Sequence, residues 1–160
     1  MKDDLKMNNP LLFISQSLLS GVLLEVSANP SPGLVSPISN GSHEDMNFYS
    51  FMLSAAAIAP FFHFCAEAGY GSGPEADVLS LIRPEGVKTE QLMFQATQGI
   101  NTQKGIIFLG GITAAAAGRV FRQQQSLTAS EICREVASIC QGIVDRELEK
   151  TKGHADSSLT

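Results

Sequence analysis

The sequence is poor in charge and in cysteine, and each shortage excludes a class of protein. Charged residues make up 17% of the 160 residues, the formal net charge is −5, and no cluster of lysine or arginine exceeds two. A nucleic-acid binder needs a basic surface, so the sequence predicts no nucleic-acid partner. Cys65, Cys133 and Cys140 lack any metal-type spacing such as C-x-x-C, and we expect them to be reduced thiols of a cytoplasmic protein.

Two apolar stretches raise the question of a membrane. Residues 11–24 are interrupted by Gln16 and serines, and the residues before them mix lysines with aspartates, which argues against a signal peptide. Residues 46–66 contain no Asp, Glu, Lys or Arg, but they contain Pro60, His63 and several other polar residues. We therefore expect buried helices of a soluble protein and no membrane span.

Apolar residues recur at three- and four-residue steps almost throughout, which is typical of helices, and no alternating strand pattern is present. The prediction is an all-α, compact domain of about five to six helices over residues 1–160, with a flexible tail at 153–160. The expected helices cover residues 11–28, 42–68, 74–84, 89–98, 103–123 and 128–153.

Local signals place the ends and one contact surface of these helices. Ser42 with Asp45 has capping-box spacing, and Thr102 and Thr128 are suited to cap the helices that follow them. Pro84 is expected to end a short helix. The alanine run 114–117, flanked by glycines, predicts a smooth surface for close helix packing.

The turn at residues 99–105, with the sequence GINTQKG, is a candidate phosphate site. A glycine-flanked turn into a helix directs backbone N–H groups at one point, and Lys104 adds a positive charge. The Walker spacing is absent. An ordinary capped helix with a solvated lysine explains the same residues.

Three carboxylates and a histidine are candidates for acid–base work. Glu25 lies beside the apolar stripe in the last turn of its helix, where an anion is unfavourable, so a paired or functional role and a simple salt bridge both fit. His43 and Asp45 fall in what reads as a helical first turn, where a neutral histidine beside carboxylates can share a proton or Asp45 can simply cap. Asp145 sits on a charged helix end, where a solvated face is the default reading.

Several separated motifs in order resemble one family, the triphosphoribosyl-dephospho-CoA synthases. The resemblance covers about residues 11–150 and corresponds to the N-terminal half of a longer family member. It is carried by EV at 25–26, PSPGLV at 30–35, NGSHEDM at 40–46, EQLM at 90–93, TQGINTQKG at 97–105, IFLG at 107–110 and GIVDREL at 142–148.

The resemblance implies an all-helical transferase that uses ATP and 3′-dephospho-CoA. The 2′-hydroxyl of dephospho-CoA attacks C1′ of the ATP ribose, adenine leaves, and the product becomes the prosthetic-group precursor for the acyl carrier protein of citrate lyase or malonate decarboxylase. Mg²⁺ is expected with the triphosphate. The implied site residues are Glu25, His43 and Asp45 for catalysis, Asn101, Thr102, Gln103, Lys104, Gly105 and Gly33 for nucleotide binding, and Asp45, Glu90 and Asp145 for the metal.

The chain departs from the family pattern at three positions and in length. Ser31, Ser36 and Gln103 replace a lysine, an aspartate and a histidine of the family, so each loses an ionisable group. Family members continue for roughly as long again, so we expect self-association or a missing C-terminal half that covers apolar surface. A nucleotide-binding or interaction module without turnover, and an N-ribosyl hydrolase, are the alternatives to a transferase.

Overall fold

The computed structural model describes residues 9–73 and 77–143, and these residues form five α-helices. The helices are α1 (Pro10–Ser27), α2 (Phe48–Gly71), α3 (Val78–Ala96), α4 (Lys104–Gln124) and α5 (Ala129–Cys140). The only extended pairing in the described residues is an isolated bridge between Ser36 and Ser39. The predicted all-α class is confirmed, whereas the predicted tail at 153–160 lies outside the described residues.

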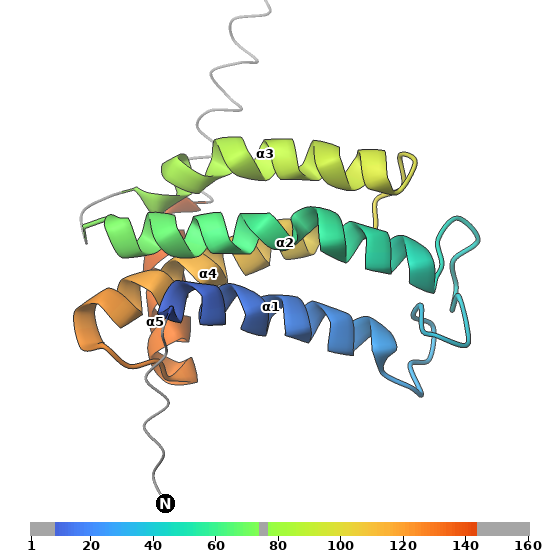
Figure 1. Cartoon of the computed structure of the whole chain (residues 1–160), viewed down its shortest axis with the longest axis horizontal. Helices are drawn as coiled ribbons and strands as arrows, with labels where there is room; N and C mark the ends of the chain where they lie inside the picture. The colour runs from blue at the N-terminus through green and yellow to red at the C-terminus, as the bar shows by residue number, and fades with distance from the viewer. Residues whose placement is uncertain (1–8, 74–76, 144–160) are drawn as a thin grey trace, which may run out of the picture.

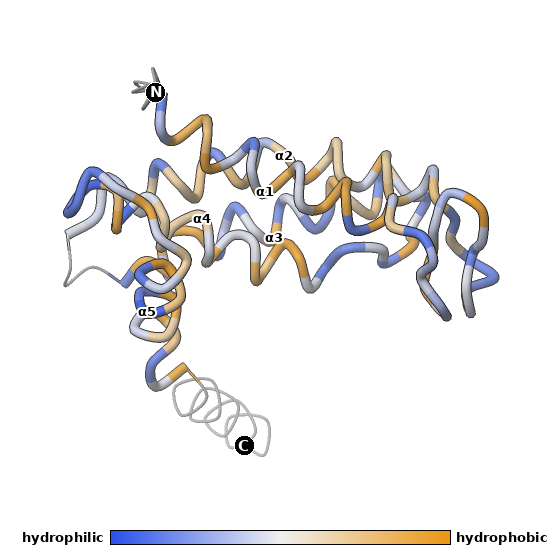
Figure 2. The backbone as a smooth tube through the Cα atoms, turned by 90° about the horizontal axis from the view of Figure 1, so that it is seen from below, coloured by the Kyte–Doolittle hydropathy of each residue, from blue (hydrophilic) through white to orange (hydrophobic). Residues whose placement is uncertain are grey.

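Helix α2 lies at the centre of the fold. Successive helices α1 to α4 run back and forth along the long axis of the molecule, with α1 and α3 on either side of α2 and α4 behind it (Figure 1). Helix α5 packs mainly against α4 and extends away from the other helices at one end (Figure 2). The core is formed by α2 side chains such as Phe62 and Ile58, with Met93 of α3 and Ile112 of α4, all no more than 1% exposed.

Helices α2 and α4 approach until their backbones touch. A Cβ atom placed on Gly118 would lie 2.1 Å from the backbone oxygen of Ala66, and one on Gly69 would lie 1.9 Å from that of Ala115. Neither position has room for any side chain. The smooth surface predicted for the alanine and glycine run of α4 is therefore confirmed, and its partner is α2.

Two predicted helix starts are wrong. Helix α2 begins six residues later than the expected Ser42, because the side chain of Asn47 accepts hydrogen bonds from the Tyr49 and Ser50 N–H groups and forms the capping box instead. The N-cap of α4 is Gln103, which makes no side-chain cap. The cap role predicted for Thr102 falls to Asn101, whose Oδ1 accepts from the Lys104 N–H at 3.3 Å.

Two further predictions about helix length are wrong. The expected break at Pro84 does not occur. Helix α3 follows its N-cap Asp77 and continues through this proline to Ala96. The packing of α3 on α2 and α4 compensates for the missing N–H. Helix α5 ends at Cys140, and Gly142 just after it takes a left-handed conformation (φ 69°), so the predicted helix is interrupted there. The part of that prediction from residue 144 to 153 lies outside the described residues.

Buried polar chemistry in this fold centres on Arg119 of α4, which is 5% exposed. Its guanidinium pairs with Glu135 of α5 at 3.0 Å and donates to Ser72 Oγ at 3.1 Å, beyond the end of α2. Arg119 therefore joins three elements at one end of the fold. In the same interior, burial, and secondarily the charge of Glu85, raises the pKa of the Cys65 thiol to about 12, so it stays protonated. All three cysteines are free.

Three helices, α1, α2 and α4, are long and apolar enough to cross a membrane by length and composition. Most of the apolar window of α4 is buried inside the fold (61%), but only 22% of that of α1 and 33% of that of α2 are buried. Figure 2 shows hydrophobic residues recurring along α1 and α2. These two helices therefore present apolar surface on the outside of the fold.

We predict that Gly118→Ala lowers the free energy of unfolding by roughly 1–3 kcal/mol, because the added methyl group would overlap the α2 backbone. The matched control is Gly21→Ala in the interior of α1, where a Cβ atom meets nothing within 4 Å. That change should raise the free energy of unfolding by roughly 0.5–1 kcal/mol. Urea denaturation measures both, and equal effects of the two variants would contradict the described contact.

Candidate functional site

A cavity of about 660 Å³ lies between α1, the loop that precedes α2, α2 itself and the start of α4. We call it the α1–α4 cavity. Most of its lining is apolar, and its polar side chains are Ser17, Glu25, His43, Thr102 and Gln103. Four of these five residues belong to the sequence motifs singled out above, although they come from three separate parts of the chain.

The loop between α1 and α2 brings His43 to this cavity by folding on itself. The Ser42 N–H donates to the Gly33 carbonyl oxygen at 3.2 Å, which ties the proline-rich turn to the segment that carries His43. Gly33 and Gly41 take positive φ values of 77° and 60°. A Cβ atom on Gly41 would lie 2.5 Å from the carbonyl oxygens of Gly33 and Leu34. Gly33 therefore shapes the loop and does not line the cavity.

Glu25 reaches the same cavity from the last turn of α1. It is an exposed residue rather than a buried member of the apolar stripe. Ser17 and Gly21 precede it at four-residue steps and line the cavity with it. The sequence analysis missed Ser17 and Gly21. Their signal was the small or polar residue at every fourth position of an otherwise apolar helix, which places them on one face.

The turn before α4 supplies two buried polar atoms that no group of the described chain satisfies. Gln103 is 5% exposed, and within residues 9–73 and 77–143 neither its Oε1 nor Thr102 Oγ1 has a hydrogen-bond partner. The Gln103 N–H is held by Met93 Sδ at 3.4 Å. An unsatisfied buried polar atom costs about 1–3 kcal/mol. Both residues line the α1–α4 cavity, so this unpaired polar chemistry lies next to it.

The turn itself is rigidly held from α3. The Thr97 hydroxyl lies within hydrogen-bond distance of two carbonyl oxygens, that of Met93 at 2.8 Å and that of Ile100 at 2.6 Å, and can donate to either. The Gly99 N–H donates to the Phe94 carbonyl oxygen at 2.7 Å. Gly99 has φ 90°, a conformation that favours glycine. The turn therefore presents the N-terminal end of α4, with Gln103 at the cavity and Gly105 exposed beside it.

Lys104 points elsewhere. Its Nζ lies 2.7 Å from Glu90 Oε1 on α3, and both residues line a separate cavity between α3 and α4. Two residues predicted for different roles, phosphate binding and metal binding, are thus an ion pair. The pair is partly solvated, because 57% of the Lys104 side chain and 27% of the Glu90 side chain are exposed.

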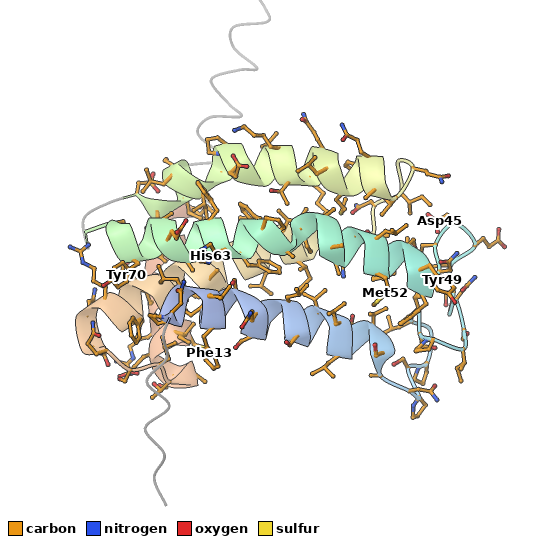
Figure 3. The ribbon with its side chains drawn as sticks, viewed as in Figure 1. Phe13, Asp45, Tyr49, Met52, His63 and Tyr70 are labelled. Carbon is orange, nitrogen blue, oxygen red and sulfur yellow. The ribbon has the colours of Figure 1, made fainter. Side chains whose placement is uncertain are left out.

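The structure does not bring the predicted metal ligands together. Asp45 lies in the loop at the end of the bundle where α2 begins (Figure 3). Its Oδ1 lies 3.9 Å from His43 Nδ1, beyond hydrogen-bond distance, and it does not line the cavity. Asp145 lies outside the described residues. Among residues 9–73 and 77–143, no three His, Cys, Asp or Glu side chains form a group that could hold a metal ion.

Comparison with known proteins shows which sequences this chain resembles. A family model described as ATP:dephospho-CoA triphosphoribosyl transferase matches residues 12–160. A protein of Pectobacterium atrosepticum named 2-(5''-triphosphoribosyl)-3'-dephosphocoenzyme-A synthase is 42% identical over 147 residues, which are 91% of this chain and 49% of the relative. No solved structure matches the chain at a significant level.

Two further relatives carry the same name with the prefix "probable". The protein of Vibrio cholerae is 42% identical over 80% of this chain and 42% of its own length. The protein of Albidiferax ferrireducens is 44% identical over 79% of this chain and 43% of its own length. The chain therefore spans about half the length of these curated relatives.

We predict that Gln103→Met raises the free energy of unfolding by about 1 kcal/mol, because it replaces a buried, unsatisfied amide by an apolar side chain of similar length. The control is Gln95→Met on α3, where the side chain is exposed and the change should stay within about 0.5 kcal/mol. Urea denaturation measures both. A loss of stability in Gln103→Met would show that the amide is satisfied in the folded protein.

Proposed function

Because the chain belongs to the ATP:dephospho-CoA triphosphoribosyl transferase family, we propose that it transfers the 5-triphosphoribosyl group of ATP to the 2′-hydroxyl of 3′-dephospho-CoA and releases adenine. The observation that supports this most is the α1–α4 cavity, which is lined by Glu25 and His43 together with Thr102 and Gln103, two residues that each carry an unsatisfied polar atom. A general base and hydrogen-bonding groups for a sugar are thus combined in one place.

The roles follow from what the reaction needs. The bond from C1′ to adenine breaks while a bond from C1′ to the attacking oxygen forms, so positive charge develops on the ribose and a carboxylate beside it is stabilising. Glu25 is the proposed carboxylate. The hydroxyl must lose its proton to a base, and the proposed bases are His43 and Glu25, which both line the cavity. Asp45, whose Oδ1 lies 3.9 Å from His43 Nδ1, is the third proposed acid–base group.

Gln103 binds rather than transfers protons. Its amide oxygen accepts a hydrogen bond but has no titratable proton, and it is 5% exposed at the cavity. We propose that Gln103 and Thr102 hold ribose hydroxyls or phosphate oxygens. The turn that begins at Asn101 and the first residues of α4, up to Gly105, contribute helix-dipole charge to the triphosphate. Lys104 contributes its ammonium group from the α3 side.

Mg²⁺ fits this site only as a companion of the triphosphate. The described residues provide no group of three ligands for a resident ion, and Glu90 already pairs with Lys104. Mg²⁺ commonly needs only one or two carboxylates when substrate phosphates complete its shell. Asp45, Glu90 and Asp145 remain the proposed carboxylates. The metal supplies charge neutralisation of the phosphates.

We place the protein in the cytoplasm, where its nucleotide substrates are. The product, a triphosphoribosyl derivative of dephospho-CoA, is destined for the acyl carrier protein of citrate lyase or malonate decarboxylase. These partners rest on the family reaction alone.

The outer face of α2 is the proposed contact with a further polypeptide. Helix α2 packs against α1, α3 and α4, yet the side away from α4 carries Tyr49, Leu53 and Phe64, which are 75%, 56% and 39% exposed. Figure 3 looks onto this side, with Tyr49 and Tyr70 near opposite ends of α2. Because relatives are about twice as long, we propose that a polypeptide equivalent to their remaining half covers this face.

We predict that Glu25→Gln lowers kcat for adenine release at least about 100-fold, because the carboxylate is lost from the reacting centre. Glu44→Gln is the control, since Glu44 is exposed in the same loop as His43 and does not line the cavity. Free adenine is measured with ATP and Mg²⁺, with and without 3′-dephospho-CoA. Release only with dephospho-CoA supports the transferase, release without it identifies an N-ribosyl hydrolase, and saturable ATP binding without adenine identifies a binding module.

We predict that the chain alone self-associates through the outer face of α2, because exposed apolar surface on neighbouring positions of a helix favours association. Sedimentation velocity should show dimers or larger species, and Leu53→Lys with Phe64→Lys should shift them towards monomer. The control is Leu81→Lys with Leu92→Lys, two positions of α3 that are each 50% exposed. A monomeric chain, or an equal effect of both pairs, would contradict the role of this face.

A further inference from the structure

A second cavity of about 300 Å³ lies between α3 and α4. We call it the α3–α4 cavity. Its wall is mostly apolar and includes Phe61, Ile82, Val87 and Phe108, and its polar groups include the Glu90–Lys104 ion pair. Val87 and Phe108 are each 54% exposed, so the apolar wall is open to solvent.

Two glycines leave room for an aromatic ring that lines this cavity. A Cβ atom on Gly111 of α4 would lie 2.6 Å from Phe61 Cε1, and one on Gly86 of α3 would lie 3.3 Å from Phe61 Cζ. Glycine inside a helix costs about 1 kcal/mol relative to alanine. The ring of Phe61 therefore occupies space that ordinary side chains on α3 and α4 would fill, and the cavity keeps an aromatic surface.

The two cavities lie on either side of the first turn of α4. Gln103 and Ile106 line the α1–α4 cavity, whereas the next residue after each, Lys104 and Ile107, lines the α3–α4 cavity. Neighbouring residues of a helix point in different directions, so one turn forms a wall of both. A transfer between two nucleotides needs adjoining room for more than one group, and the α3–α4 cavity adjoins the proposed reacting centre.

We propose that the α3–α4 cavity binds the adenine ring of a nucleotide substrate. This inference rests on the proposed function, in which both ATP and dephospho-CoA carry adenine. A flat base is matched by the exposed phenyl ring of Phe108 and by aliphatic side chains, on which its faces can stack. Its edge presents an amino donor, which the Glu90 carboxylate accepts in place of the metal role considered above, while Lys104 stays with the phosphates.

The size of the cavity agrees with a base rather than a whole nucleotide. A volume of about 300 Å³ lies at the lower end of the range for small-molecule pockets, roughly 300–1,000 Å³. The charged remainder of the nucleotide would leave past Lys104, towards the turn that begins α4.

The test is a titration of the full chain with free adenine, followed by methyl NMR. The methyl groups of Val87, Ile82 and Ile107 should shift saturably. Val87→Asp should weaken adenine binding by about tenfold or more, because a carboxylate disrupts the apolar wall. Leu81→Asp is the control, since Leu81 lies on the same helix, is 50% exposed and lines neither cavity. It should change the affinity by less than about twofold.

A second pair of variants, both to alanine, keeps the test valid if the aspartate variants do not fold. Phe108→Ala should weaken adenine binding, whereas Leu109→Ala should not, although the two residues are adjacent and are 54% and 55% exposed. Displacement of adenine by ATP assigns the site to the transferred nucleotide, and displacement by dephospho-CoA assigns it to the acceptor. Displacement by neither, shifts confined to Val22 and Val35 of the other cavity, or equal effects within each pair would overturn the proposal.

Failure of this inference and failure of the proposed function are distinguishable. Adenine binding at Val87 requires no turnover, so binding without transfer would sink only the transferase. Dephospho-CoA-dependent adenine release with unchanged adenine binding in Val87→Asp and Phe108→Ala would sink only the adenine site.

Discussion

The close contact between α2 and α4 is the constraint on which the remaining structure depends. The backbones meet where Gly69 faces Ala115 and Gly118 faces Ala66, so the distance between the two helices is set by main-chain atoms. At this distance Phe61 and Phe62 of α2 lie against Gly111 and Gly110 of α4. Helices α1 and α3 then pack on either side of the same pair, and the two cavities are the spaces left beside α4.

The first turn of α4 owes its functional interest to this arrangement. Because α4 is held against α2, its N-terminal end projects between α1 and α3 and contributes to both cavities. Gln103 faces one and Lys104 the other. The motif at residues 99–105, which the sequence predicts as one phosphate site, therefore lines two separate cavities. The chemistry on each side differs, with buried unsatisfied polar atoms on one and a solvated ion pair on the other.

Apolar residues serve two purposes that the composition alone does not separate. Those of α4 build the interior, where its alanine run is almost fully buried. Those of α1 and α2 remain on the surface to a large extent. A chain that spans about half the length of its relatives has an apolar outer face where a further part of the protein is proposed to pack.

The sequence by itself determined the helices, the close-packing surface of α4 and the membership of Glu25, His43 and Gln103 in one set of motifs. Periodicity and glycine placement are local properties, so they are readable from the chain. Competition between caps decided that α2 begins after Asn47 and α4 after Gln103, and packing decided that α3 passes through Pro84. Only the tertiary structure decided that Lys104 pairs with Glu90, that Asp45 stays outside the cavity and that Arg119 is buried. Each depends on which side of a helix meets which neighbour, and that is set by contacts distant in the chain.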